Sequence, residues 1–306
     1  MKKRAAYAAL NVCNMSGFDE HKLYNKGITE KSAEMIRSFL PQNEKNTEIR
    51  VFESIDSTST YSKLYIDELM SSENEHSLVL AYEQTAGRGR QGKTFSSKKN
   101  NGIYMTLGIG VHRKMEDFLF ITSACEVALV RGLNKLYAEA GYVPEEPPKI
   151  KWVNDIWQGD KKICGILTEA VNNYSEGIIE YAVIGIGINI GTDINRLPEE
   201  LRAIAGSIGL SISDREHIAA SIASEIFSVA ERLKADKSIA NELIKEYRKE
   251  SMIIGRCVNW STAGVLNEGI AVDINNEGNL LVETDTGIVK LNSGLVSVRP
   301  KKAEGK

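Results

Sequence analysis

Regular alternation of apolar and polar residues begins near residue 48 and continues almost to the C-terminus. Before it, the sequence predicts one short helix at 32–40, which Pro41 ends. A strand is expected at 49–53, and Ser57 is placed to cap the helix that follows. That helix carries four apolar side chains at helical spacing, namely Tyr61, Leu64, Tyr65 and Leu69.

Five apolar segments in the middle of the chain predict strands. Two are expected at 77–83 and 103–111, on either side of a segment rich in glycine and arginine. Three more follow a proline-rich turn, at 149–153, 163–170 and 178–190. Polar residues at 172–177 predict a hairpin turn between the last two.

Three helices are predicted around these strands. The longest is expected at 116–140, where Gly141 ends it, and its apolar positions are Leu119, Ala124, Val127, Ala128 and Leu136. Ser213 and Glu216 have the spacing of a capping box. The helix after them carries Ile218, Ile222, Ile226, Val229 and Leu233, and a last helix carries Ile239, Leu243 and Tyr247.

Strands and helices that do not alternate as βαβ units indicate an α+β domain of roughly 200 residues, which we place at 47–250. From Gly255 the apolar segments become short, with strands expected at 256–260, 264–272, 280–283, 289–291 and 296–299. Closely spaced short strands with Asn- and Gly-rich turns indicate a small all-β barrel, at 251–306. Residues 1–46 are left as an N-terminal extension.

Composition excludes several classes of protein. With 38 basic and 41 acidic residues among 306, the net charge of −3 excludes a chain-wide basic surface for nucleic acid. No apolar run approaches the roughly 20 residues that span a bilayer, and the apolar stretch at 5–10 is too short for a signal peptide. The four scattered cysteines argue against a disulfide framework or a zinc site and indicate a reducing cytoplasm.

One segment, GRGRQGKT at 87–94, matches the P-loop motif of nucleotide-binding proteins letter for letter. A P-loop needs a helix that begins at its Lys-Thr pair, so that the helix N-terminus faces the phosphates. Here the turn-rich residues 95–102 lead into a strand instead. The context therefore argues against a P-loop NTPase.

The same segment concentrates positive charge. Five basic residues and no acidic one lie between Gly87 and Asn100, namely Arg88, Arg90, Lys93, Lys98 and Lys99. A bare run of charge is usually a solvated loop or a nucleic-acid contact. Alternation of glycine with arginine favours a loop that orders over a small anion, because arginine forks bind phosphate and carboxylate.

A second group of polar residues is KWVND at 151–155, followed by KKICGIL at 161–167. An Asn-Asp pair that ends one strand and a lysine that starts the next would meet at one edge of a sheet, which puts a carboxylate and an ammonium beside one reacting centre. An ordinary Asn-Asp turn with exposed lysines is equally consistent with these residues alone. GIGIN at 185–189 lacks the dinucleotide-binding spacing, and its glycines indicate plain packing or close approach by a ligand or backbone.

Together these motifs resemble those of the biotin–protein ligase (biotin–[acetyl-CoA-carboxylase] ligase) family. The resemblance rests on DST at 56–58, QTAGRGRQG at 84–92, KWVND at 151–155, KICGIL at 162–167 and GIGIN at 185–189. They occur in the family's order and spacing and cover about residues 48–300. The combination of the Gly-Arg loop with KWVND is specific, whereas each motif alone is weak.

The resemblance implies a catalytic domain related to class II aminoacyl-tRNA synthetases, followed by an SH3-like barrel. It also implies a reaction in two steps. Biotin and Mg-ATP give biotinyl-5′-AMP and pyrophosphate, and the adenylate then acylates one lysine of a biotin carboxyl-carrier protein. ATP and Mg²⁺ are therefore the expected cofactors, and the carrier domain is the expected protein partner.

The same resemblance assigns roles to particular residues. Lys162 and Arg90 would supply positive charge where the two anions meet, and Asp155 would orient or deprotonate the carrier lysine. Biotin would be held by Ser57, Thr58, Gln84, Gly87, Arg88, Lys162 and Gly165. ATP or the adenylate would be held by Arg90, Lys93, Phe95, Asn154 and Asn189. Asn154 and Asn189 would contact ATP or its metal, and the metal ligands are otherwise left open.

Four positions depart from the family's usual residues. Ser59 stands where Asn is usual and Val153 where Pro is usual, and both changes look tolerable. Lys93 replaces a common Arg, which keeps the charge but loses the fork. Phe95 replaces a common Trp and offers a smaller aromatic cover.

Some members of the family carry an N-terminal winged helix-turn-helix and also act as repressors. About 46 residues precede the catalytic domain here, against roughly 60 or more for a winged helix with its linker, and no two-helix DNA-reading motif is visible. We therefore expect a truncated or absent DNA-binding domain and no DNA partner. A lipoate or octanoate ligase or transferase of the same superfamily and a biotin-responsive repressor are the alternatives, and a homodimer is left open.

Overall fold

The computed structural model describes residues 29–70, 74–173, 175–191, 199–236, 238–262, 264–292 and 299–300. Most of the extension expected at 1–46, including any remnant of a helix-turn-helix, lies outside these residues. Its described part contains α3 (Glu30–Phe39), close to the helix predicted at 32–40, and a short 3-10 turn at Gln42–Glu44.

A seven-stranded sheet forms the larger part of the molecule, in the order β1-β2-β3-β7-β6-β5-β4. It is antiparallel throughout except where β1 pairs with β2. The strands are β1 (Glu48–Phe52), β2 (His76–Ala81), β3 (Gly102–Lys114), β4 (Pro148–Lys151), β5 (Asp155–Gln158), β6 (Lys161–Asn173) and β7 (Ile178–Asn189). The mixed α+β class expected from the sequence is therefore confirmed.

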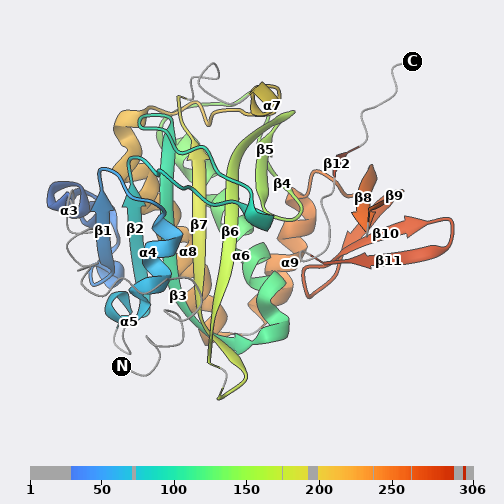
Figure 1. Ribbon diagram of the computed structural model, residues 1–306, viewed down its shortest axis with the longest axis horizontal. Helices are drawn as coiled ribbons and strands as arrows, with labels where there is room; N and C mark the ends of the chain where they lie inside the picture. Colours follow the sequence, from blue (N-terminus) through green and yellow to red (C-terminus); the bar gives the residue numbers. More distant parts are fainter. Residues whose placement is uncertain are drawn as a thin grey trace, which may run out of the picture.

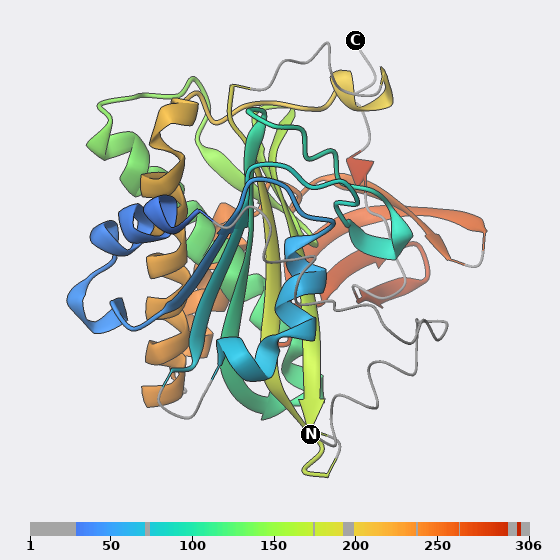
Figure 2. The same cartoon turned by 60° about the vertical axis from the view of Figure 1, so that its left-hand side comes forward.

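Helices lie on both faces of this sheet. Figure 2 shows α8 on one side of the sheet and α4 on the other, and α6 packs along α8 (Figures 1 and 2). The helices are α4 (Thr58–Leu64), α5 (Ile66–Leu69), α6 (Phe118–Glu139), α7 (Glu199–Arg202), α8 (Arg215–Ala235) and α9 (Ile239–Glu250). Because both faces are covered, the first nine residues of β3 are all buried.

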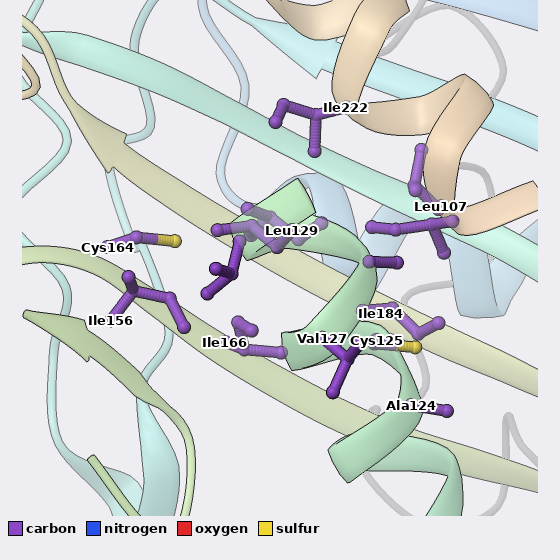
Figure 3. Close-up of a cluster of buried hydrophobic side chains, with 14 of the residues drawn as sticks. Leu107, Ala124, Cys125, Val127, Leu129, Ile156, Cys164, Ile166, Ile184 and Ile222 are labelled. Atoms are coloured by element: carbon purple, nitrogen blue, oxygen red, sulfur yellow. The ribbon is translucent and has the colours of Figure 1, made fainter. Parts of the chain in front are cut away.

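The core lies between α6 and the sheet. Figure 3 shows Val127 and Leu129 of α6 close to Ile156, Ile166 and Ile184 of three strands. These side chains are all buried, which fits the long apolar run that predicted the helix. The side chains of α6 that point away from the sheet pack against α8, so α6 is buried nearly all round.

The strand β5 was not predicted. The sequence indicated two strands between 149 and 170, but the structure has three, with a turn at 152–154 and a second turn at 159–160. A strand of only four residues between two tight turns has too short a pattern to stand out from the sequence. Its presence means that KWVND spans the turn from β4 into β5.

The helix predicted after Ser57 differs from the structure in its length and in its apolar face. The helix after Ser57 is broken at Tyr65 into α4 and α5, and Leu64 is 45% exposed, so it does not belong to the apolar face. Ser57 does cap α4, since its side chain accepts a hydrogen bond from the Thr60 amide.

The capping box predicted at Ser213 and Glu216 does not form. A 3-10 turn, capped by Ser211, leads directly into α8 at Arg215. Glu216 instead accepts a hydrogen bond from the Tyr82 hydroxyl at 2.6 Å. A tertiary partner that lies far away in the sequence therefore replaces the local pairing.

The C-terminal part is a five-stranded antiparallel sheet, in the order β11-β10-β9-β8-β12. Its strands are β8 (Cys257–Thr262), β9 (Val265–Ile274), β10 (Leu280–Thr284), β11 (Gly287–Leu291) and β12 (Arg299–Pro300). Each overlaps a short strand that the sequence predicted. Residues 296–298, which begin the last predicted strand, lie outside the described residues.

The turn between β9 and β10 connects the small sheet to the large one. The Trp152 indole Nε1 donates a hydrogen bond to the Gly278 carbonyl at 3.0 Å. Gly278 has a φ of +84° and lies so close to α6 that a Cβ there would be 2.9 Å from Ser123 Oγ. Arg248 of α9 adds an ion pair to Asp273 at 2.7 Å.

Within the described part of the chain, the helices are too short or too polar to span a bilayer.

We predict that Glu44→Gln makes the protein progressively more stable than the wild type as pH rises from about 4.5 to about 7. Burial raises the pKa of Glu44 to about 7, and the hydrogen bond from Ser224 offsets part of this effect. Between these values the unfolded chain has already lost the proton that the native state keeps, so wild-type stability falls with rising pH. We expect the difference to reach about 2 kcal/mol in urea unfolding. The exposed Glu34→Gln is the control, and an equal response to pH in both variants would contradict the prediction.

Candidate active site

A cleft of about 1350 Å³ opens between the sheet, the start of α4, the Gly- and Arg-rich loop and the segment that leads into β8. Small-molecule sites occupy clefts of several hundred Å³ or more. Eleven of the thirteen candidate site residues line it: Thr58, Gln84, Arg88, Arg90, Lys93, Phe95, Asn154, Asp155, Lys162, Gly165 and Asn189. The structure therefore brings together residues that lie up to 131 positions apart in the chain.

Asp155 and Lys162 form an ion pair at the centre of this cleft. Lys162 Nζ lies 2.6 Å from Asp155 Oδ1, and the two side chains are about three-quarters buried. The β5–β6 hairpin holds them, with Asp155 opposite Gly165 and Lys162 opposite Trp157. The sequence predicted this convergence at a sheet edge, although it occurs within a hairpin rather than between the ends of two longer strands.

Arg90 approaches the same point from the loop. Its Nη1 donates to Asn154 Oδ1 at 3.0 Å, and Asn154 Nδ2 donates in turn to the Ile166 carbonyl at 2.8 Å. Burial lowers the pKa of Arg90, while the nearby Asp155 carboxylate opposes this effect. Two cations and one carboxylate therefore meet at the cleft, which leaves a net positive charge for an anion.

Asn189 supports the pair from β7. Its Nδ2 donates to the Lys162 carbonyl at 3.2 Å, so it fixes the backbone of the lysine. This contact shows how a residue at the end of GIGIN reaches the same site.

Glycines shape the floor of the cleft. Gly165 of β6 lies opposite Gly187 of β7, and the Phe95 ring packs against both. A Cβ on Gly187 would lie 2.4 Å from the ring, and one on Gly185 would lie 2.6 Å from Ser59 Oγ. Of the two explanations that the sequence left open for these glycines, the contacts with the Phe95 ring and the Ser59 hydroxyl group correspond to packing of side chains.

A polar network lines the inner end of the cleft. Gln84 Oε1 accepts from the Thr58 amide at 2.9 Å and from its hydroxyl at 3.1 Å. Gln84 Nε2 donates to Ser97 Oγ at 2.8 Å, and Thr106 Oγ1 donates to Thr58 Oγ1 at 2.8 Å. These contacts hold the Thr58 and Gln84 polar groups in fixed positions without a ligand.

Two candidate residues lie just outside the cleft. Ser57 is buried and its hydroxyl is used as the cap of α4. Gly87 is packed against the chain after the loop, where a Cβ would be 2.5 Å from the Phe95 carbonyl oxygen. Neither residue is among those that line the cleft.

The basic loop, defined here as residues 87–94, is a tight turn. The Gly89 amide donates to the Lys93 carbonyl at 2.7 Å, and the Phe95 amide donates to the Gly87 carbonyl at 2.9 Å. Thr94 pairs with Arg88 and Ser97 with Gln84, so the chain after Lys93 is extended rather than helical. The geometry that a P-loop requires is therefore replaced by a small hairpin.

A fully buried carboxyl group lies beneath the site. Glu126 of α6 has no exposed surface, and the equally buried Tyr247 hydroxyl group is its polar neighbour. Burial raises the pKa of Glu126 well above its usual range and the Asp155 carboxylate raises it further, while the Tyr247 hydroxyl group and Arg90 lower it. Burial beside Asp155 therefore favours the protonated form of Glu126.

Several residues that line the cleft were not among the candidates. Lys151 lies with its Nζ 3.9 Å from the centre of the Trp157 ring, and Met252 and Arg256 reach the cleft from the segment before β8. Lys151 belongs to KWVND, so its motif was a signal. No sequence signal marked Trp157, because β5 was not predicted. None marked Arg256 either, because the segment before β8 is brought to the cleft by a tertiary contact, the bridge between Ile150 and Ser251.

Within the described residues, no group of three or more His, Cys, Asp or Glu side chains is arranged to hold a metal ion. The carboxylate nearest the centre of the cleft, Asp155, is engaged by Lys162. The residues present therefore do not fit a resident metal site.

Family models match both parts of the chain. Residues 51–189 match the Biotin/lipoate A/B protein ligase family, and residues 253–299 match the Biotin protein ligase C terminal domain. The chain is 32% identical to the Bifunctional ligase/repressor BirA of Bacillus subtilis (strain 168) over 220 residues, which is 72% of this chain and 65% of that protein. It is 27% identical to a Biotin--[acetyl-CoA-carboxylase] ligase of Mycobacterium tuberculosis over 222 residues, 71% of this chain and 77% of the relative.

The fold is also found among solved structures. The Biotin protein ligase from Aquifex aeolicus in complex with biotin and ATP aligns with a TM-score of 0.65 and 22% identity, over 83% of this chain and 99% of that one. A Biotin Protein Ligase from Leishmania major in complex with biotin aligns with a TM-score of 0.55 and 23% identity, over 81% and 99%. At these identities the likeness concerns the fold.

The first match defines the class as that of the biotin and lipoate protein ligases. The match to the C-terminal domain and the relatives distinguish the biotin ligases within this class. The chain belongs to the biotin protein ligase family. It spans about two thirds, 65%, of the length of the Bacillus relatives.

We predict that Gly187→Ala destabilises the protein mainly through a clash with Phe95. A Cβ 2.4 Å from the ring forces the ring off the sheet, which costs about 1–3 kcal/mol. In a Phe95→Ala background the same substitution should cost much less. Urea unfolding of the four proteins of this double-mutant cycle measures the difference, and strictly additive effects would show that the ring does not lie on Gly187.

Proposed function

We propose that this protein is a biotin–protein ligase, which activates biotin with Mg-ATP and transfers it to a lysine of a biotin carboxyl-carrier protein. The observation that carries the proposal is the meeting of Arg90 with the Asp155–Lys162 pair over a glycine-lined floor. Membership of the biotin protein ligase family supports it.

The finer fold assignments belong to the same proposal. A class II aminoacyl-tRNA synthetase-like domain at 47–250 is supported by the antiparallel large sheet, since β1 begins at Glu48 and α9 ends at Glu250. An SH3-like barrel at 251–306 is supported by five short antiparallel strands.

In the first step, a carboxylate oxygen of biotin attacks the α-phosphorus of ATP and the bond to the β-phosphate bridging oxygen breaks, which releases pyrophosphate. Two anions repel each other as they approach, so positive charge at their meeting point lowers the barrier. Lys162 and Arg90 supply that charge. Asn154 orients the Arg90 guanidinium, and Asn189 fixes the Lys162 backbone.

Biotin would lie along the floor between Gly165 and the Thr58–Gln84 network. Thr58 and Gln84, together with the backbone at Gly87 and Arg88, would bind the polar ureido group, and Ser57 would hold the start of α4 in place. The adenylate would lie toward Phe95, Lys93 and Asn189. Mg²⁺ enters as part of the Mg-ATP substrate, because the described residues build no metal site.

In the second step, the carrier lysine must lose a proton before its amine attacks the acyl carbon. Asp155 is the group placed to accept this proton or to orient the amine. The new amide bond forms as the bond between the acyl carbon and the AMP oxygen breaks. The basic loop and Phe95 would exclude water, which would otherwise hydrolyse the mixed anhydride.

We predict that the purified protein adds biotin to one lysine of a carrier domain when supplied with biotin and Mg-ATP, and that Lys162→Ala lowers adenylate formation by about a hundredfold or more. The neighbouring Lys161→Ala is the matched control, because Lys161 Nζ donates to the Ala203 carbonyl away from Asp155. Mass spectrometry of the carrier and pyrophosphate release measure the two steps. Transfer of lipoate or octanoate in place of biotin would support the alternative ligase, and no transfer of any of them would refute the proposal.

We predict that Gly87→Ser mainly speeds the release of biotinyl-5′-AMP. The new side chain meets the Phe95 carbonyl and Ser97 Oγ, so the hairpin of the basic loop opens. Stopped-flow displacement of the adenylate measures the off-rate, with Ala86→Ser at the adjacent exposed position as the control. An unchanged off-rate would mean that the loop does not retain the adenylate.

A further inference from the structure

The two arginines of the basic loop have different partners. Arg90 points to Asn154 at the centre of the cleft, as described above. Arg88 instead makes a two-pronged ion pair with Glu169 of β6, in which Nη1 lies 3.1 Å from Oε2 and Nη2 lies 3.1 Å from Oε1. The two arginines have similar neighbours in the sequence, but in the structure their guanidinium groups bind different residues.

Glu169 also binds a cation from a third element. Lys63, near the end of α4, places its Nζ 2.6 Å from Glu169 Oε1. One carboxylate therefore joins the basic loop, β6 and α4. The Glu169 and Lys63 side chains are only about one fifth exposed, so solvent screens the charges of this pair less than those of an open surface pair. Arg88 is 42% exposed, and its two parallel contacts fix the geometry of its ion pair with Glu169.

The position of Glu169 follows from the alternation of side chains along β6. Gly165 and Leu167 both line the cleft, and Glu169 is the next residue on the same face of the strand. It therefore stands at the end of the cleft floor, where the loop comes down onto the sheet.

The rest of the basic loop has few other anchors. Gln91, Gly92, Lys93 and Thr94 are exposed, and the hydrogen bonds at Gly89 and Phe95 join the loop to itself. The Glu169 carboxylate is thus a fixed point on the sheet for a glycine-rich segment whose backbone is otherwise easily moved.

We propose that Glu169 is a positioning residue that holds the basic loop over the cleft through Arg88, which leaves Arg90 to act on the ligand. Its effect on ligand retention rests on the proposed function, whereas its effect on the loop does not. Without the carboxylate, Arg88 and Lys63 are two like charges side by side, and their repulsion moves the loop off the sheet. Retention of the adenylate then decreases, while Lys162, Asn154 and Asp155 stay in place.

Limited digestion with trypsin tests the loop itself, without any ligand. In Glu169→Gln we expect cleavage after Arg90 and Lys93 to be about tenfold faster than in the wild type, because opening is the step that exposes these bonds. Glu53→Gln is the matched control, since Glu53 pairs with Lys99 outside the loop at 2.8 Å. The charge exchange Arg88→Glu with Glu169→Arg restores the opposite-charge contact and should restore slow cleavage at the same two bonds. Equal cleavage of Glu169→Gln and Glu53→Gln would overturn the proposal.

Release of biotinyl-5′-AMP tests the consequence for the ligand. We expect Glu169→Gln to raise the off-rate of the adenylate about tenfold and to leave the rate of its formation at saturating biotin and Mg-ATP within about twofold of the wild type. Faster cleavage with an unchanged off-rate would overturn the positioning role. If the wild type forms no adenylate, the proposed function fails, and the trypsin result alone then decides whether Glu169 anchors the loop.

Discussion

The ion pair between Asp155 and Lys162 is the interaction on which the arrangement of the site depends. The two residues are seven positions apart, and the short β5–β6 hairpin places their charged ends 2.6 Å from each other. Two neighbours help to hold this pair in position: Asn189 hydrogen-bonds the Lys162 backbone, and Gly165 leaves room beside the Lys162 ammonium group. Burial and the Asp155 carboxylate raise the pKa of Glu126, which lies in α6 near the pair.

Much of this site could be predicted because its residues occur in short motifs with characteristic spacing. KWVND and the lysine that follows it were consistent with a carboxylate and an ammonium beside one centre and equally with an ordinary turn, and the structure brings Asp155 and Lys162 together within the β5–β6 hairpin. The context around GRGRQGKT likewise excluded a phosphate-binding helix, and the chain after Lys93 is extended. The long buried helix and strands were visible for the same reason, because their apolar patterns run over ten residues or more.

Contacts between distant residues were out of reach of such reasoning. No sequence pattern indicates that Arg88 pairs with Glu169, 81 positions away. None indicates that Glu216 accepts a hydrogen bond from Tyr82 and does not pair with Ser213. The strand β5 was missed because four residues carry almost no periodicity, and Trp157 was missed with it. Local patterns define elements and motifs, whereas the choice among several possible charge partners is made by the packing of the whole chain.

The hydrogen bond from the Trp152 indole to the Gly278 carbonyl has a consequence for how this chain can be recombined. Trp152 begins the turn that carries Asn154 and leads to Asp155, while Gly278 lies in the turn between β9 and β10 and fits closely against α6. A chimera that exchanges the C-terminal sheet with that of a relative must therefore preserve the path of the 275–279 turn as well as the strands. The Arg248–Asp273 ion pair adds a second contact that such an exchange must keep.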